Sequence, residues 1–213
     1  MTHVLVSIGD RSYALSETLR STELAPIFDD AWTASRVWES SRFLAECLVR
    51  FSSESPAFFN VSDGQSVLEL GSGCGLVGLV AASLGANVLL TDQQEAIELL
   101  HRNIKTNATS ESELARLHVA EFVWGSDWTP PCSSYHYILV SDCINPIYDQ
   151  ESWRDLARSI SRLSSQDTVT YLAHEARGDD EAMTDFLTFS ADVLRSENMK
   201  QQGKISLYRI TKL

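Results

Sequence analysis

The sequence contains no uninterrupted apolar run near the length that a membrane-spanning helix requires. Its first ten residues, 1–10, are too few and too mixed in polarity to form a signal peptide. These two absences argue against a membrane partner and against secretion. We therefore expect a cytoplasmic protein, with the nucleus as a second location.

Cysteine and histidine are few and widely scattered. The four cysteines form no Cys-x-x-Cys pair, and the five histidines form no His-x-x-x-His or similar cluster. A zinc site normally needs such spacing, so we expect no bound metal. Isolated thiols are better explained as small buried or half-buried side chains in a reducing compartment.

Positive charge is also scarce, with 17 basic residues against 29 acidic ones and a formal net charge of −12. A general nucleic-acid binder needs a basic surface, so we expect no nucleic-acid partner. The negative charge is compatible with a basic partner or substrate, and equally with simple solubility. The chain has 213 residues, of which 44% are hydrophobic and 22% charged, enough for one soluble domain with a substantial core.

The pattern of the chain changes from a β-hairpin and a helix to alternating strands and helices. Residues 3–17 alternate around Gly9-Asp10, which predicts a hairpin, and apolar spacing over 37–51 predicts an amphipathic helix. We expect the rest to form strands at 66–71, 87–92, 117–125, 135–142, 168–175 and 204–213, with helices at 76–85, 95–107, 149–163 and 180–196.

Crossover helices between strands indicate an α/β fold with a doubly wound, mostly parallel, Rossmann-like sheet. We expect a single domain over 1–213, in which 1–35 is a hairpin and loop attached to a core at 36–213.

The strongest chemical signal is the glycine-rich stretch "VLELGSGCGLVG" at 67–78. Gly71, Gly73 and Gly75 separate a predicted strand from a predicted helix, where the backbone can approach a ligand and the helix N-terminus can face it. Asp92 ends the next strand, nineteen residues after Gly73, and its carboxylate could accept both hydroxyls of a ribose. These features favour a nucleoside-containing cofactor over a glycine-rich turn without a ligand.

The spacing by itself leaves two cofactors open. Gly73-x-Gly75-x-x-Gly78 also fits the dinucleotide fingerprint, so an NAD-dependent oxidoreductase remains an alternative. The acidic Glu69, two residues before the first glycine, makes E-L-G-S-G-C-G resemble motif I of the seven-β-strand S-adenosyl-L-methionine (SAM) methyltransferases. That resemblance implies SAM as the cofactor and a role for Glu69 in positioning the loop and the methionine end.

Four further stretches occur in the order found in one branch of these enzymes. They are "RVWESSRFLAECL", "EFVWGSD", "SDCI" and "HEAR". Together they resemble the methyltransferase-like 21 group of protein lysine methyltransferases. The resemblance implies transfer of a methyl group to a lysine of a protein substrate, such as a chaperone, an ATPase or a translation factor.

The resemblance also implies the cofactor site residue by residue. It places Trp38 at the lip of the pocket and Ser141 at the wall that closes it. The methionine and ribose would lie against Gly71, Ser72 and Gly73, and Asp92 would bind the ribose hydroxyls. Gln93 and Trp124 would lie beside the adenine. Some of these side chains have simpler interpretations. Trp38 could anchor a helix, and Trp124 could be a core residue. Glu175 and Arg177 could form a structural ion pair.

The predicted catalytic residues are Asp142, Asn145 and Tyr148. Asp142 follows a strand at the ligand-binding edge and would orient the target amine through hydrogen bonds, although it could also serve as a helix cap or a loop acceptor. Asn145 stands where the related group usually has a tyrosine. Tyr148 would have to replace that aromatic, and Pro146 restricts its path. The run N-P-I-Y also faintly resembles the N-P-P-Y of enzymes that methylate exocyclic or amide nitrogens.

Three alternatives to lysine methylation therefore stay open besides the NAD enzyme. They are a non-catalytic SAM-binding interaction module, methylation of another nitrogen, and methylation of a small molecule. At the C-terminus only residues 196–202 separate the last predicted helix from the last predicted strand. The related fold closes with an antiparallel strand pair, so we expect one of these strands to be very short or absent.

Overall fold

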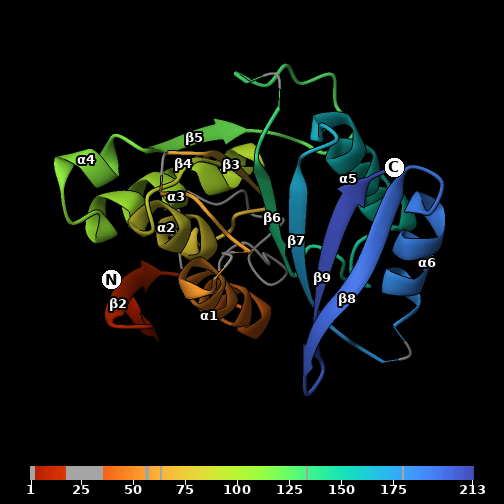
Figure 1. Ribbon diagram of the computed structural model, residues 1–213, viewed down its shortest axis with the longest axis horizontal. Helices are drawn as coiled ribbons and strands as arrows, with labels where there is room; N and C mark the ends of the chain where they lie inside the picture. Colours follow the sequence, from red (N-terminus) through yellow and green to blue (C-terminus); the bar gives the residue numbers. More distant parts are fainter. Residues whose placement is uncertain (1–2, 18–35, 56–57, 63, 133, 179) are drawn as a thin grey trace.

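The computed structural model describes residues 3–17, 36–55, 58–62, 64–132, 134–178 and 180–213. Most of the described strands belong to one sheet (Figure 1). These are β3 (Ser66–Leu70), β4 (Asn87–Asp92), β5 (Leu117–Glu121), β6 (Tyr137–Ser141), β7 (Val169–Glu175), β8 (Leu194–Gln202) and β9 (Ile205–Lys212). The helices are α1 (Glu39–Ser53), α2 (Leu76–Ser83), α3 (Gln94–Asn107), α4 (Glu111–Leu114), α5 (Gln150–Leu163) and α6 (Glu181–Ser190).

The strands follow the order β5-β4-β3-β6-β7-β9-β8. Neighbours from β5 to β7 pair in parallel, whereas β9 is antiparallel to both β7 and β8. The predicted doubly wound, mostly parallel sheet is confirmed. Because the strand order reverses between β3 and β6, the carboxyl ends of these strands border the crevice where such sheets bind ligands.

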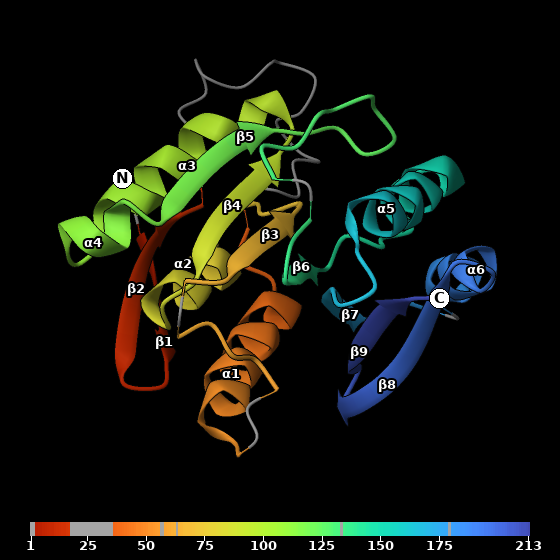
Figure 2. The ribbon, with the colours of Figure 1, turned by 45° about the horizontal axis from the view of Figure 1, so that its top comes forward.

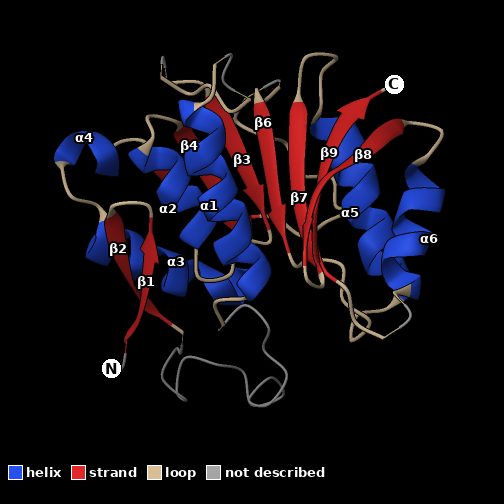
Figure 3. Ribbon diagram, turned by 60° about the horizontal axis from the view of Figure 1, so that its bottom comes forward, coloured by secondary structure: helices blue, strands red, loops and turns tan. Residues whose placement is uncertain are grey.

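Helices cover both faces of the sheet and divide the interior into two cores (Figures 2 and 3). One core contains side chains of α1, α2 and α3, and the other contains side chains of α5 and α6. Strand β3 supplies both, since Val67 faces the first core and Leu68 and Leu70 face the second. Burial on both faces explains why the central strands read as continuous apolar runs.

The N-terminal hairpin consists of β1 (His3–Ile8) and β2 (Arg11–Ser16), joined at the predicted Gly9-Asp10 turn. It docks on α3 through two asparagine amides. Asn103 accepts from the Ser16 N–H at 2.8 Å, and Asn107 accepts from the Ala14 N–H at 2.7 Å. The loop predicted after the hairpin lies largely outside the described residues.

Two predicted boundaries were wrong, and so was the expectation that one strand of the C-terminal pair is very short or absent. The last helix ends at Ser190 instead of 196, and β8 is a nine-residue strand that pairs along its length with β9. The antiparallel closure of the sheet is therefore complete. Strand β8 is polar and lies at the sheet edge, where charged side chains discourage further pairing, so it lacks the apolar alternation of a typical strand. The strand predicted to reach 125 ends at Glu121.

Among the described residues, no helix has both the length and the apolar character needed to cross a membrane.

Candidate functional site

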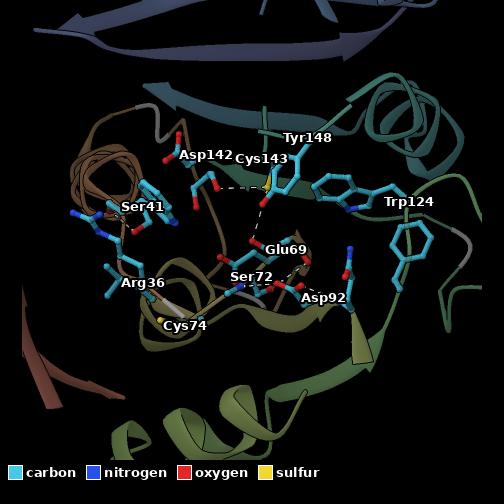
Figure 4. A pocket seen from close by; sticks show the side chains of 18 of the residues that line it. Arg36, Ser41, Glu69, Ser72, Cys74, Asp92, Trp124, Asp142, Cys143 and Tyr148 are labelled. Carbon is cyan, nitrogen blue, oxygen red and sulfur yellow. Dashed lines mark hydrogen bonds between the residues drawn. The ribbon is translucent and has the colours of Figure 1, made fainter. Parts of the chain in front are cut away.

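A cavity of about 410 Å³ opens at the carboxyl ends of β3, β4 and β6 (Figure 4). Its size lies within the range of small-ligand and cofactor pockets. Eleven of the twelve predicted site residues line it, and Asn145 does not. The eleven are Trp38, Glu69, Gly71, Ser72, Gly73, Asp92, Gln93, Trp124, Ser141, Asp142 and Tyr148. Figure 4 shows Ser41 and Asp142 toward one end of the pocket and Trp124 toward the other.

The loop from Gly71 to Gly75 depends on close packing as well as on backbone freedom. Gly71 has a φ of 63°, and a Cβ at that position would lie 2.6 Å from the Cys143 Sγ and 3.0 Å from the Trp124 ring. No side chain can therefore replace this hydrogen without displacing a wall of the cavity. Gly78, the third glycine of the dinucleotide-like spacing, instead leaves room for the Glu69 carboxyl, since its Cβ would lie 2.6 Å from Oε2.

Glu69 holds the glycine loop against the start of α2. Its side chain is buried, and its Oε2 accepts the backbone N–H of Gly78 at 3.1 Å, in the first turn of that helix. Burial raises the pKa of the Glu69 carboxyl to about 8, more than the hydrogen bonds from Ser72 and Gly78 lower it. The loop-positioning role implied for Glu69 matches this geometry.

Asp92 fastens the same loop to the end of β4. Its Oδ2 accepts the N–H of Gly73 at 2.7 Å and its Oδ1 accepts the N–H of Gln93 at 2.8 Å. Burial raises the pKa of the Asp92 carboxyl to about 6, and these two bonds oppose the rise. Each carboxylate oxygen keeps a second acceptor position, so Asp92 can still receive hydroxyl donors from a ligand.

Trp124 and Gly125 form the wall beyond β5. The Trp124 ring is half-buried and packs against Gly71 and the core under α5. Gly125, with a φ of 79°, has no room for a Cβ because the Asp155 carboxyl of α5 lies against it. The N–H of Gly125 also donates to the Ser159 Oγ at 3.1 Å. The W-G pair therefore sets Trp124 at the cavity and joins this loop to α5.

Asp142 is the residue that the structure constrains most tightly at the other end. It adopts a φ of 58°, a left-handed conformation that Asp tolerates better than most residues, and its N–H donates to the carbonyl of Ala173 at 2.9 Å. Its buried carboxylate accepts both arms of the Arg177 guanidinium, at 2.8 and 2.5 Å. Glu175 is a weaker partner of Arg177, with its Oε2 at 3.5 Å. The predicted Glu175–Arg177 pair exists, but the main ion pair joins Arg177 to Asp142.

Trp38 immediately precedes α1 and also lines the cavity, so helix anchoring and pocket lining coincide in one side chain. The guanidinium carbons of Arg36 and Arg177 lie 5.0 and 5.1 Å from its ring centroid. Such distances allow cation–π attraction. The indole therefore links the start of α1 to the loop that follows β7.

The segment from Asn145 to Tyr148 folds back as a tight turn. The Asn145 Oδ1 accepts the N–H of Ile147 at 3.1 Å, and its backbone carbonyl accepts the N–H of Tyr148 at 2.9 Å. Asn145 is 4% exposed and holds the turn, while Tyr148 reaches the cavity despite Pro146. Asp149 caps α5, and its Oδ1 accepts the Ser152 N–H at 2.9 Å.

Several lining residues were not predicted. Arg36, Val37 and Ser41 flank Trp38, so the V-W stretch could have indicated them. Ser152 and Asp155 reach the cavity from α5, and no sequence motif around them predicts this. Cys143 is buried, with its Sγ 3.4 Å from the carbonyl oxygen of Leu70, and burial raises the pKa of its thiol, which therefore stays protonated. Within the described chain, no group of three or more His, Cys, Asp or Glu side chains is arranged to hold a metal ion.

Comparison with known proteins places these features in context. A family model described as "Lysine methyltransferase" matches residues 29–191. Protein N-lysine methyltransferase METTL21A of Xenopus tropicalis is 42% identical over 112 residues, which are 53% of this chain and 50% of that protein. EEF1A lysine methyltransferase 3 of the same organism is 26% identical over 181 residues, 84% of this chain and 75% of that protein. The chain thus spans about half the length of the METTL21A relative.

Solved structures share the fold. A TehB-like SAM-dependent methyltransferase from Corynebacterium glutamicum has a TM-score of 0.59 at 16% identity, covering 84% of this chain and 89% of that one. The ribosomal protein L11 methylase from Lactobacillus delbrueckii subsp. bulgaricus has a TM-score of 0.57 at 16% identity, covering 79% and 77% respectively. At these identities the similarity establishes the sheet and its helices.

Proposed function

Because this chain belongs to the lysine methyltransferase family, we propose that it is a SAM-dependent N-methyltransferase that modifies lysine in a protein substrate. One observation carries the proposal. The glycine loop fastened to Glu69 and Asp92 and the pair Asp142 and Tyr148 line the same cavity, at the edge of the sheet where ligands bind.

The cofactor that the family implies is S-adenosyl-L-methionine, and the cavity has the groups that it needs. Asp92 retains acceptor positions for ribose hydroxyls, and Trp124 offers an aromatic surface for the adenine.

When bound, S-adenosyl-L-methionine supplies an activated methyl group on a sulfonium sulfur. The chain must then present an unprotonated amine in line with that methyl group. Removing the proton from a free lysine at pH 7 costs about 4.6 kcal/mol, given its usual pKa near 10.4. Tyr148 and Trp38 would exclude water from the amine, and this desolvation would disfavour its charged form, while Asp142 would orient the amine.

The position of Tyr148 supports catalysis over a purely binding role. The related group has an aromatic residue three positions after the acidic one, and Asn145 stands there instead. The turn at Asn145 returns Tyr148 to the cavity, so an aromatic side chain is supplied from further along the chain. The Asn145 amide oxygen is used within the turn, which disfavours recognition of a planar substrate amide by this residue.

For the substrate we propose a protein of the chaperone, ATPase or translation-factor class. The named relatives include an EEF1A lysine methyltransferase, and the net charge of −12 suits a basic segment around the target lysine. We also propose a cytoplasmic location, with the nucleus as a second one. Fractionation of cells and detection of the untagged chain would test the location.

The decisive experiment combines radiolabelled SAM, the purified full chain and fractionated cell extract. We expect label on one protein band, with mass spectrometry assigning it to lysine, and loss of label in Asp142→Asn with binding of S-adenosylhomocysteine retained. Cofactor binding without any transfer would instead support a non-catalytic module, and label in low-molecular-weight material would support a small-molecule substrate. Absence of both SAM binding and transfer would refute the proposal.

A further inference from the structure

The ion pair between Asp142 and Arg177 is arranged asymmetrically with respect to the cavity. Asp142 lines the cavity, whereas Arg177 is absent from the described residues that line it. The Asp142 side chain is 1% exposed and the Arg177 side chain 26% exposed, so the carboxylate is almost completely covered. The cavity wall at Asp142 therefore contains a carboxylate whose charge is already matched by Arg177.

The loop that carries Arg177 is held in place from several directions. Arg177 also donates to the backbone carbonyl of Glu175 at 3.0 Å. Asp180, which immediately precedes α6, accepts a 2.6 Å hydrogen bond from the buried His174. The N–H of Asp180 bonds the carbonyl of Arg177 at 3.2 Å. These contacts fix the guanidinium opposite Asp142, so its position follows from the fold and needs no ligand.

We propose that Arg177 is a positioning residue that sets the charge of the cavity wall at Asp142, so that the cofactor and the target amine meet a neutral pair rather than a bare carboxylate. This inference rests on the proposed function. A bare carboxylate would stabilise a protonated amine and hinder its deprotonation. A carboxylate that is paired with Arg177 stabilises a nearby positive charge less strongly.

The charge matters because methyl transfer moves positive charge through this part of the cavity. The amine nitrogen uses its lone pair to form the N–CH3 bond while the S–CH3 bond breaks, and sulfur keeps that electron pair as a neutral thioether. The new methylammonium then carries the positive charge, and its proton can pass to water. A wall that is too negative would favour the sulfonium and the protonated amine before transfer, without an equal gain in the transition state.

The cofactor and its product provide a probe of this charge that needs no substrate. S-adenosylmethionine and S-adenosylhomocysteine differ by one methyl group and one positive charge at sulfur. The ratio of their dissociation constants therefore reports the electrostatic potential of the site. At an effective dielectric of about 20, a unit charge about 12 Å away changes such an equilibrium by about tenfold, and a nearer charge changes it by more.

The experiment measures both dissociation constants by calorimetry for the full chain and four variants. All five proteins are measured at the same pH and ionic strength. In Arg177→Gln the preference for S-adenosylmethionine should rise about tenfold, because the carboxylate loses its partner. In Asp142→Asn it should fall about tenfold, because Arg177 is left unpaired.

Two further variants act as matched controls. Arg177→Lys keeps the charge and should leave the ratio within about threefold of the wild-type value. The double variant Arg177→Gln with Asp142→Asn removes both charges and should restore the wild-type ratio. A purely structural role would weaken binding of both ligands alike, so an unchanged ratio in both single variants would overturn the inference. The two single variants are expected to change the ratio in opposite directions. If Arg177→Gln does not fold, the change in the ratio for Asp142→Asn is therefore enough to test the inference.

Failure of this inference is distinct from failure of the proposed function. If the wild-type chain binds neither ligand, the proposed function fails and this inference fails with it. If the wild-type chain binds both and the ratio does not respond to Arg177 or Asp142, only the charge-setting role is refuted.

Discussion

The side-chain amide of Asn103, on α3, donates a hydrogen bond to the backbone carbonyl of Cys74 at 2.9 Å. The same amide group donates to the carbonyl of Ser16, and its oxygen accepts the N–H of Ser16. One fully buried asparagine therefore connects the N-terminal hairpin to the glycine loop of the cavity. The hairpin is thus mechanically coupled to the cofactor site, although it contributes no described lining residue.

Replacing Asn103 should affect both stability and ligand binding. Asn103→Ala removes the hydrogen bonds that this side chain makes to the backbone of Ser16 and Cys74, so we expect a loss of about 2–4 kcal/mol in the free energy of unfolding. Affinity for S-adenosylhomocysteine should also fall about tenfold, because the glycine loop loses a support. Urea denaturation and calorimetry measure the two effects.

Asn107 provides a matched control. It bonds the hairpin backbone at Ala14, and among its described hydrogen bonds none reaches the glycine loop. Asn107→Ala should lower the free energy of unfolding by about 1–3 kcal/mol. The affinity for S-adenosylhomocysteine should stay within about twofold of the wild-type value. Equal losses of affinity in both variants would contradict a specific coupling through Asn103.

Glu69 makes the stability of the cofactor-free protein depend on pH. Burial raises the pKa of its carboxyl from 4.5 to about 8, so the folded chain holds a proton that the unfolded chain has released. The free energy of unfolding should therefore fall as pH rises from about 4.5 to about 8, and level off above that. Asp92, whose pKa is raised from 3.8 to about 6, contributes in the same direction at lower pH.

Glu69→Gln isolates this effect. The amide is neutral at every pH, so between about pH 6 and pH 8 the variant should show a flatter stability profile than the wild type. Urea titrations at several pH values measure the difference. Parallel profiles over that interval would show that Glu69 is ionised in the folded protein throughout.

The glycine at position 71 should tolerate substitution less than a glycine that only needs a positive φ. Gly203, in the β8–β9 turn, has a φ of 60° and nothing within 4 Å of a Cβ. Gly203→Ala should lower the free energy of unfolding by about 1 kcal/mol, because only the cost of a positive φ for alanine applies there. Gly71→Ala adds contacts with Cys143 and Trp124 and should cost about 2–4 kcal/mol, with weakened cofactor binding.

A second substitution separates the two contributions at Gly71. Adding Cys143→Ala removes the sulfur that lies 2.6 Å from the new Cβ, so part of the loss should be recovered. Thermal denaturation of the four variants gives the coupling. If Gly71→Ala and Gly203→Ala lower the free energy of unfolding equally, close packing of the loop against Cys143 does not contribute to stability.

Tyr148 should matter for transfer more than for cofactor binding. Removal of the ring in Tyr148→Ala should lower the methylation rate by at least about tenfold, because the amine loses an apolar neighbour and a wall. Tyr148→Phe keeps the ring and should retain most of the rate. Initial rates with the labelled substrate protein, together with S-adenosylhomocysteine affinity, test this. A larger loss of affinity than of rate would assign Tyr148 to the cofactor instead.

Much of the fold followed from local pattern. Continuous apolar runs marked the central strands, and the Gly9-Asp10 turn marked the hairpin, because these features depend on neighbours in sequence. The polar edge strand β8 was missed for the opposite reason. Its residues 194–202 alternate poorly, and only pairing with β9 makes them a strand. Strand β5 ends early because Phe122 and Trp124 turn toward the cavity and the core under α5.

By itself, the sequence determined the α/β order, the glycine loop and the acids at the strand ends, because each is a local pattern with a local physical cause. The tertiary structure decided which groups meet. It joined Arg177 to Asp142 across 35 residues, brought Tyr148 rather than Asn145 to the cavity, and tied the hairpin to Cys74 through Asn103. Such contacts depend on how the strands order and how the loops return, and no spacing along the chain encodes those distances.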